Sequence, residues 1–260
     1  MNELFYNTPY LWIAISGFLG LALGSFINSF VWRGAQSQST SSKRSVCIHC
    51  RRTLAWHENI PLLSFTFLKG KCRTCQKPIP RHYPLVEALT MLSLVAASWF
   101  SFHQHFSPIH LLRDLIFIFI LITIFVSDGL YQHISSSILA IGIVTGFVLN
   151  YFFLSYSLTS LLIAAGVASG FFLLQFVISR GKWIGSGDIF MGIMMGIWLG
   201  WPNILVALLI SYIVGALIGI FLLLTKQKKA DARIAFGTFL AIGTVVSLYW
   251  GNTIIKLLSY

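Results

Sequence analysis

Two carboxylates lie at the ends of long apolar stretches, where an ionisable side chain is costly to place. Asp128 follows the apolar run 121–126, and Asp188 closes the sequence Gly185-Ser186-Gly187-Asp188 and opens another apolar run. An ionisable group at such a position is a functional candidate by default. The two aspartates are sixty residues apart (188 − 128). We therefore expect them on different helices that could face each other across a bundle.

The chemistry that two such carboxyls suggest is aspartyl hydrolysis. Two carboxyls held close together cannot both ionise, so one stays protonated while the other is a carboxylate. The carboxylate can take a proton from water, and its partner can protonate the polarised or departing group. Because such a pair titrates jointly, the sequence does not say which aspartate is the acid and which is the base.

Each aspartate also has a purely structural interpretation. Asp188 could be a helix N-cap after a glycine-rich turn, and Asp128 could be a turn residue in the dipeptide Asp128-Gly129. The residues below Asp188 favour the functional interpretation, because three glycines follow at intervals of four and share one helix face: Gly192, Gly196 and Gly200. This face predicts a smooth groove where another helix, or an extended substrate, can approach.

The four cysteines form two C-x-x-C pairs with 21 residues between them: Cys47, Cys50, Cys72 and Cys75. Two such knuckles supply four thiolates at a spacing that suits structural zinc. A segment of about forty residues is too small to be held together by apolar burial alone, so a metal has a physical reason to be there. The alternatives are a redox pair or four unrelated thiols, and His49 or His57 could replace a cysteine as ligand.

The composition excludes an ordinary soluble domain. Of the 260 residues, 57% are hydrophobic and only 10% are charged, whereas a soluble domain carries about 25% charged residues. The net charge is +11, and residues 33–87 hold ten of the eighteen Lys and Arg against two acids, Glu58 and Glu87. Without a recognition helix or an aromatic-studded sheet, this basic segment does not indicate nucleic acid. It predicts a cytoplasmic segment that faces anionic headgroups.

Eight apolar runs predict an all-α polytopic membrane protein of about eight helices. The runs are 10–32, 85–102, 112–127, 134–154, 158–178, 188–200, 203–225 and 234–258, of which the sixth is short for a full span. The predicted domains are a first transmembrane helix (1–32), a small zinc-stapled module (33–84) and a seven-helix domain (85–260). We expect both termini outside. The segments that then lie in the cytoplasm, as the positive-inside rule requires, are the module, residues 128–133 and the basic loops at 180–182 and 226–233.

The ordered motifs of the chain resemble those of the type IV prepilin leader peptidases, which are GxGD aspartyl proteases. They are Gly24-Ser25-Phe26-Ile27-Asn28, Arg33, the two knuckles with Trp56–Ser64 between them, Arg81–Glu87, Asp128, Gly185-Ser186-Gly187-Asp188 and Phe236-Gly237. These motifs cover almost the whole chain. A GxGD sequence alone is weak evidence, but its combination with the knuckles in this order is specific.

The resemblance implies an enzyme of the bacterial inner membrane that removes the basic leader from type IV prepilins and type II secretion pseudopilins. Asp128 and Asp188 match the catalytic aspartates, Gly185 and Gly187 support the second, and the four cysteines match the zinc ligands. Many members then methylate the new N-terminus with S-adenosylmethionine. The candidates for binding this cofactor or the substrate are Glu58, Glu87, Arg81 and Tyr83. For the two glutamates, local ion pairs with neighbouring arginines are an equal alternative.

The chain departs from the family pattern at three positions. Ser135 stands where the family usually has proline, Phe190 where it has lysine, and Ala235 where it has proline. These changes bear on fine geometry, substrate range or methylation more than on proteolysis. Two other classes of protein stay open: a transporter or channel whose aspartates bind an ion, and a membrane scaffold whose zinc module docks a partner.

Overall fold

The computed structural model describes residues 6–36, 45–104, 107–225 and 235–258, which are helical apart from loops and two isolated bridges. Seven helices in these ranges are long and apolar enough to cross a membrane, so the predicted helical membrane class is confirmed. The chain forms two compact units, Met1–Phe119 and Ile120–Tyr260, and the boundary falls within helix α5 (Pro108–Tyr131). Domain boundaries after residues 32 and 84 stay a prediction, and the basic loop 226–233 lies outside the described residues.

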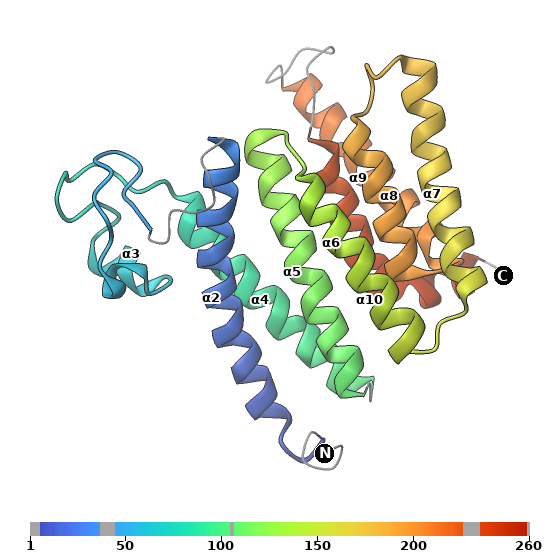
Figure 1. The fold of residues 1–260 in the computed structure, drawn as a ribbon, viewed down its shortest axis with the longest axis horizontal. Helices are drawn as coiled ribbons and strands as arrows, with labels where there is room; N and C mark the ends of the chain where they lie inside the picture. Colours follow the sequence, from blue (N-terminus) through green and yellow to red (C-terminus); the bar gives the residue numbers. More distant parts are fainter. Residues whose placement is uncertain (1–5, 37–44, 105–106, 226–234, 259–260) are drawn as a thin grey trace. The chain divides into compact units, whose positions relative to one another are not determined.

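The first unit joins two long helices and a small module through close backbone packing. Its elements before α5 are α2 (Pro9–Ala35), η1 (Trp56–Asn59), α3 (Leu63–Phe67) and α4 (His82–His103) (Figure 1). α2 meets α4 at its glycines, because an added Cβ at Gly24 would lie only 2.7 Å from the Cα of Glu87. A buried hydrogen bond from Ser98 Oγ to Ser16 Oγ (2.6 Å) joins the same two helices.

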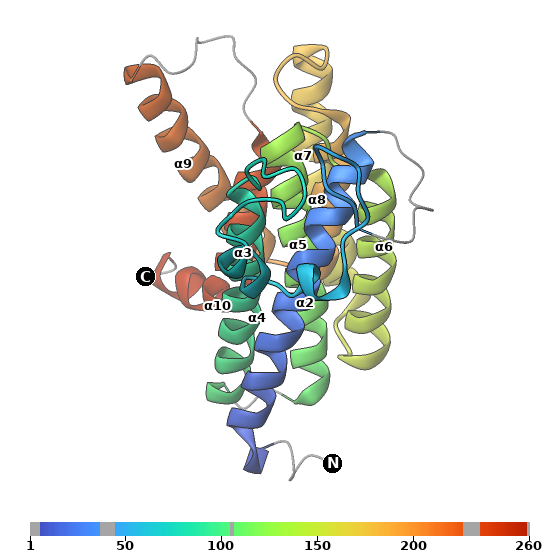
Figure 2. The same cartoon turned by 90° about the vertical axis from the view of Figure 1, so that its left-hand side faces the viewer.

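The second unit places one short helix among longer ones. After the rest of α5 come α6 (Ser136–Phe147), the π-helical turn η2 (Val148–Phe153), α7 (Leu158–Ser179), α8 (Ser186–Leu199), α9 (Asn203–Leu224) and α10 (Phe236–Leu258) (Figures 1 and 2). α8 contacts α6, α7, α9 and α10, and its residues Met191, Met194, Met195 and Trp198 are fully buried. With 14 residues it is about 21 Å long (14 × 1.5 Å), less than a bilayer core. Protein, rather than lipid, surrounds it, which explains why the sixth apolar run is short.

The glycine face of α8 is filled by α7. An added Cβ at Gly196 would lie 2.5 Å from the carbonyl carbon of Ala164, and one at Gly192 would lie 3.1 Å from backbone atoms of Ala168. Of the two occupants that the sequence predicted for this face, the helix is therefore the one found, and no groove is left there for an extended substrate. The open space lies instead at Gly166 and Gly170 of α7, where an added Cβ would meet no atom within 4 Å.

We expect Gly196→Ala to destabilise the protein by about 1–3 kcal/mol, because the added methyl group overlaps the α7 backbone. The matched control is Gly170→Ala, in which the methyl group meets no neighbour and alanine favours the helix by about 1 kcal/mol. Thermal unfolding in detergent should show a lower Tm for the first variant and an equal or higher Tm for the control. Equal Tm values for both variants would contradict the close α7–α8 packing.

Candidate functional site

Asp128 lies in the last turn of α5 rather than in a turn after the helix, and only 6% of its surface is exposed. Its carboxylate faces the first turn of α10, because an added Cβ at Gly237 would lie 2.8 Å from Asp128 Oδ2. The first N–H groups of a helix lack partners within the helix and carry partial positive charge, and those of Gly237 and Thr238 act on this carboxylate. Asp128 Oδ2 has no hydrogen-bond partner among the described residues.

Asp188 is the third residue of α8, so it is not the N-cap that the structural interpretation predicted. Its Oδ2 atom accepts a hydrogen bond from the backbone N–H of Gly185 (3.0 Å), and its own N–H donates to the carbonyl oxygen of Gly185 (3.2 Å). The side chain is 6% exposed. An added Cβ would meet no atom closer than 3.8 Å at Gly185 and 3.6 Å at Gly187, so the supporting role of these glycines stays a prediction.

The two aspartates come from separate helices and lie close enough for the charge of Asp128 to act on Asp188. Each carboxylate sits at a helix N-terminus, Asp128 at that of α10 and Asp188 at that of α8. The partial positive charge of these N-termini offsets part of the cost of burying a negative charge. Two carboxyls in one poorly solvated site share a proton more readily than they hold two charges. This arrangement can perform acid–base chemistry on a bound water.

Three further side chains shape this site. Ile134 lies against both helix starts, because its Cδ1 is 2.8 Å from an added Cβ at Gly237 and 3.8 Å from one at Gly187. Tyr212 of α9 interacts electrostatically with Asp188, and its hydroxyl donates to Gln175 Oε1 (2.9 Å). The sequence drew attention to Gly237 only as a motif residue and to Tyr212 not at all. A tyrosine within an apolar run gives no local signal of such a contact.

A further buried carboxylate, Asp114, was missed by the sequence prediction. It is fully buried in the part of α5 that belongs to the first unit. The neighbouring Arg113 donates to its Oδ1 atom from Nη2 (2.6 Å) and Nε (2.8 Å). Because a cation is paired with Asp114, its burial has a structural explanation and needs no catalytic one.

The two cysteine knuckles have the same backbone geometry. In each, the first cysteine donates its N–H to the carbonyl oxygen five residues later at 2.9 Å, Cys47 to Arg52 and Cys72 to Lys77. The residue after the second cysteine has a positive φ in both knuckles, 59° and 56°. An antiparallel bridge closes each turn. Each knuckle therefore directs two sulfurs to one side of its turn.

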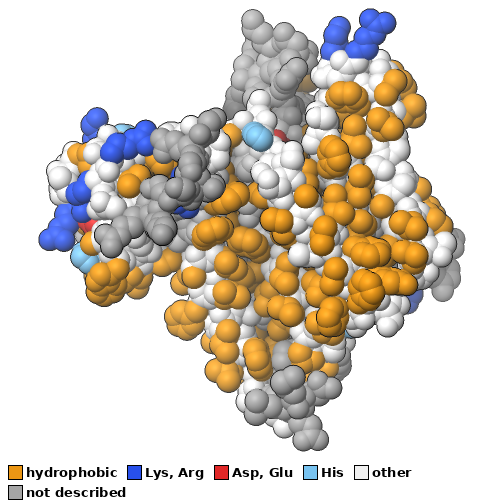
Figure 3. Space-filling view, viewed as in Figure 1, with side chains coloured by type: hydrophobic (Ala, Val, Ile, Leu, Met, Phe, Trp, Pro, Cys, Tyr) orange, Lys and Arg blue, Asp and Glu red, His pale blue; other side chains and the backbone are white. Residues whose placement is uncertain are grey.

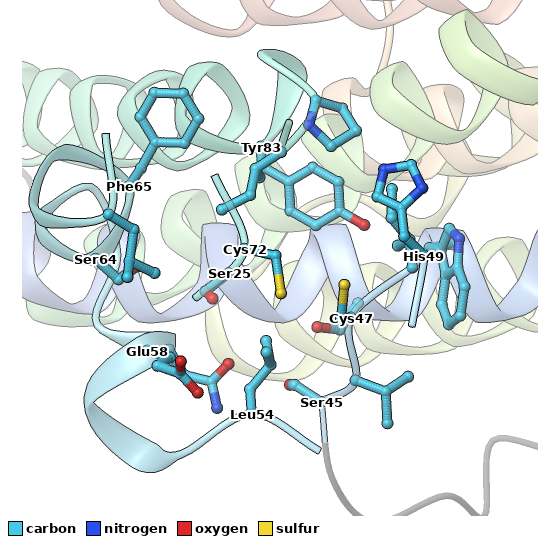
Figure 4. Close-up of a pocket in the computed structure, with 18 of the residues that line it drawn as sticks. Ser25, Ser45, Cys47, His49, Leu54, Glu58, Ser64, Phe65, Cys72 and Tyr83 are labelled. Carbon is cyan, nitrogen blue, oxygen red and sulfur yellow. The ribbon is translucent and has the colours of Figure 1, made fainter. Parts of the chain in front are cut away.

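The four cysteine sulfurs form a cluster that fits a tetrahedral metal ion. They all lie within 4.8 Å of one another, and the sulfurs of Cys47 and Cys75 are 3.9 Å apart. A tetrahedral ion with bonds of about 2.3 Å to sulfur places its ligands about 3.8 Å apart. Figure 4 shows the sulfurs of Cys47 and Cys72 directed toward each other. His49 instead contacts the carbonyl oxygen of Pro78 (3.3 Å), so the group that could hold an ion consists of the four cysteines.

The backbone around the cluster favours thiolate, the form that binds metal. The N–H groups of Cys75 and Thr74 lower the pKa of Cys72 to about 6. Although the N–H of Lys77 favours its thiolate, burial and the neighbouring cysteines raise the pKa of Cys75 to about 11. Without an ion the four sulfurs cannot all be charged, and a bound cation removes this conflict.

Glu58 forms the local ion pair that the sequence left open. Its Oε1 atom accepts from Arg52 Nη2 (2.7 Å), and its Oε2 atom accepts from the N–H of Ala55 (2.8 Å). The Arg52 guanidinium thereby holds the pKa of Glu58 below its usual range. Arg52 also interacts with Cys72, so it links this carboxylate to the cysteine cluster.

We call the segment 45–81, which contains the cysteine cluster, the metal module. A pocket of about 140 Å³ lies between this module and the two long helices of the first unit, α2 and α4 (Figure 4). Its lining includes three of the candidate binding residues, Glu58, Glu87 and Tyr83, and Figure 4 shows the Tyr83 ring directed into it. Arg81 is exposed and does not line this pocket. The cavity is smaller than the ~300 Å³ of a typical small-molecule site, so a large ligand would extend beyond it.

Glu87 is the carboxylate of this pocket that has no cation partner among the described residues. Its Oε2 atom accepts from the N–H of Leu62 (2.8 Å), and its carboxylate also interacts with the hydroxyl of Ser25. It therefore joins the module, α2 and α4 while remaining 8% exposed. A buried carboxylate bound only by neutral donors can attract a cationic ligand group.

Comparisons with known proteins point to one family. The model of the bacterial peptidase A24 N-terminal domain matches residues 18–101, and that of the type IV leader peptidase family matches residues 115–220. Two relatives named prepilin leader peptidase/N-methyltransferase come from Legionella pneumophila and Aeromonas hydrophila, and each is 32% identical in sequence to this chain. The alignments cover 98% of the chain and, respectively, 97% and 96% of the relatives' own lengths. The relative of the same name from Pseudomonas aeruginosa is 27% identical over 95% of the chain and 93% of its own length. No solved structure matches the chain.

We expect the purified protein to carry close to one metal ion per chain, because the four sulfurs form one tetrahedral set. Cys72→Ser should deplete the ion and increase proteolysis within residues 45–81, since the module has little apolar core of its own. His49→Ala, which removes a side chain next to the cluster but no proposed ligand, should retain the ion. Elemental analysis would refute the site if a variant with all four cysteines replaced still held stoichiometric metal.

Proposed function

This chain belongs to the type IV leader peptidase family, and from that membership we propose that it removes the basic leader from type IV prepilins and type II secretion pseudopilins. We assign Asp128 and Asp188 as its catalytic pair. The observation that carries this assignment is the approach of two buried carboxylates from separate helices at the N-termini of α8 and α10. A transporter would require further polar groups along a path through the bundle, and a scaffold would not require the pair at all.

The pair would act on the scissile peptide bond through one shared proton. The ionised carboxylate takes a proton from water, and the resulting hydroxide adds to the carbonyl carbon while the protonated carboxyl donates to the carbonyl oxygen. When the C–N bond breaks, the nitrogen takes the proton of the protonated carboxyl, and a hydroxyl of the diol intermediate returns a proton to the other carboxylate. This step gives a free amine and a carboxylic acid and restores the shared proton of the pair. The helix N-termini stabilise one negative charge in the buried site, and Ile134 packs beside Gly187 and Gly237 at the two helix starts.

The proposed orientation places the cleavage site at the cytoplasmic face of the inner membrane. The segment 33–84 carries ten of the eighteen Lys and Arg, which favours the cytoplasmic side. Because α4 and α5 then cross outward and inward, Asp128 at the C-terminal end of α5 returns to the cytoplasmic side. When the short helix α8 is counted as a crossing, continuing this alternation through α10 gives outside N- and C-termini. Cysteines on the cytoplasmic side are kept reduced, and their four-sulfur set suits zinc as a structural ion.

A second proposed activity is N-methylation of the amine that cleavage releases. When bound, S-adenosylmethionine would supply the methyl group. It carries an ammonium and a sulfonium, and Glu87 offers a carboxylate without a cation partner in the described part of the chain. Tyr83 would pack against the ligand, whereas Glu58, already bound by Arg52, would hold the pocket wall. Arg81 stays a candidate for contacting the part of the substrate outside the pocket.

We expect Asp128→Asn and Asp188→Asn each to abolish leader cleavage, because asparagine keeps the shape of the side chain and removes the ionisation that the mechanism uses. Cleavage of a purified prepilin by detergent-solubilised enzyme is the measurement. Each variant should still insert in the membrane and retain its metal, which shows that folding is intact. Near wild-type processing by either variant would refute the catalytic pair.

We expect Glu87→Gln to reduce methyl transfer to a pre-cleaved pilin about tenfold or more, as loss of one charge-assisted contact of about 1.5–3 kcal/mol predicts. Binding of radiolabelled S-adenosylmethionine should weaken in parallel, while single-turnover leader cleavage should stay within twofold of wild type. The reciprocal control is Asp128→Asn, which should still methylate pre-cleaved pilin. If Glu87→Gln slowed cleavage as severely as methylation, the two activities would not be separable in this way.

A further inference from the structure

The metal module exposes an apolar surface that neither proposed activity uses. Four large apolar side chains on η1, α3 and the link between them are exposed: Trp56 (80%), Ile60 (36%), Leu63 (54%) and Phe67 (81%). We call these four residues the apolar tip. On the surface of a soluble domain, a contiguous exposed apolar patch usually marks a site of interaction with a protein or a membrane. In Figure 3 hydrophobic side chains gather at one end of the module.

The exposed charges of the module that carries the apolar tip favour an anionic partner. Within residues 45–81 the exposed cations are Arg51, Lys69, Lys71, Arg73, Lys77 and Arg81. Glu58, the acid of this range, is buried and paired with Arg52, so no exposed acid offsets them there. Each such cation near an anionic membrane contributes roughly 1 kcal/mol of attraction. A basic prepilin leader would be repelled by the same surface.

The position of the apolar tip along the long helices also points to the membrane. The N–H of Leu62, the residue before α3, is bound to Glu87, five residues into α4 (87 − 82). That distance is about 7.5 Å along the helix axis (5 × 1.5 Å). Figures 1 and 2 accordingly place α3 beside α2 rather than beyond its C-terminal end. With 27 residues, α2 is about 40 Å long and exceeds the ~30 Å bilayer core, so an element at its side reaches the headgroup region.

We propose that the apolar tip inserts into the boundary between the headgroups and acyl chains of an anionic bilayer, with the surrounding lysines and arginines bound to the headgroups. Side chains at this boundary lie about 5–10 Å below the surface, as in interfacial helices that combine an apolar face with cations. The bilayer then holds the module at its edge through Trp56, Leu63 and Phe67. This attachment goes beyond the proposed function, since it concerns neither the catalytic pair nor methyl transfer.

The test uses the full-length protein in lipid nanodiscs of mixed phosphatidylcholine and phosphatidylglycerol, with a fluorescent amino acid placed at position 67. The matched control has the same group at position 76, an exposed site on the second knuckle. Lipids brominated near the carbonyl end of the acyl chain should quench position 67 about threefold more than position 76. Removing phosphatidylglycerol should lower quenching at position 67, because the cations lose their partner.

Three results would contradict the proposal. Equal lipid quenching at positions 67 and 76 would show that the apolar tip does not enter the bilayer. Protection of position 67 from aqueous iodide without quenching by brominated lipid would assign the surface to a protein, either a second copy or another partner. Quenching at position 67 that is the same with and without phosphatidylglycerol would contradict the proposed binding of the cations to anionic headgroups. Because the readout is the position of a label, none of these results depends on enzyme activity.

Discussion

Burying two carboxylates among apolar helices is the constraint on which the rest of this structure depends. An isolated buried charge is expensive, so each carboxylate lies at the N-terminus of a helix, where unpartnered N–H groups stabilise it. Asp188 bonds to Gly185 within its own helix start, whereas Asp128 reaches the start of α10. The second arrangement requires a glycine at position 237, because a Cβ there would take the space of the carboxylate. The small residues between α7 and α8 then bring the short, enclosed helix α8 close to its neighbours.

The metal module faces a different constraint, since it has too little apolar surface to form a core. The four cysteine sulfurs lie in one cluster, and a metal ion held there would compensate for the missing core. Arg52 connects this cluster to Glu58, and Leu62 connects the module to Glu87. A pocket therefore forms where the module meets α2 and α4, in a different unit from the aspartate pair. Our assignment of cleavage and methylation to different residues follows this division of the chain.

The sequence could predict the features that depend on local pattern. Apolar runs predicted the helices, and the spacing of Cys47, Cys50, Cys72 and Cys75 predicted their cluster. Features that depend on contacts between distant segments could not be read in this way. The approach of Gly237 to Asp128 is of this kind, and so is the identity of the helix that fills the α8 glycine face. For Glu58 the sequence offered a local ion pair with a neighbouring arginine as one of two alternatives, and the structure pairs it with Arg52. Asp114 was overlooked because its partner, Arg113, is adjacent in sequence and neighbours on a helix usually point apart.

The central claim is that peptide cleavage depends on the carboxylate of Asp128 at the N-terminus of α10. Single-turnover cleavage of saturating prepilin by Gly237→Ala tests it most directly, because the added methyl group would lie 2.8 Å from Asp128 Oδ2 without changing any ionisable group. The account predicts a rate constant lower by about tenfold or more, equivalent to about 1.4 kcal/mol, with Gly166→Ala unchanged as the control. Indistinguishable rate constants for Gly237→Ala and wild type would contradict it.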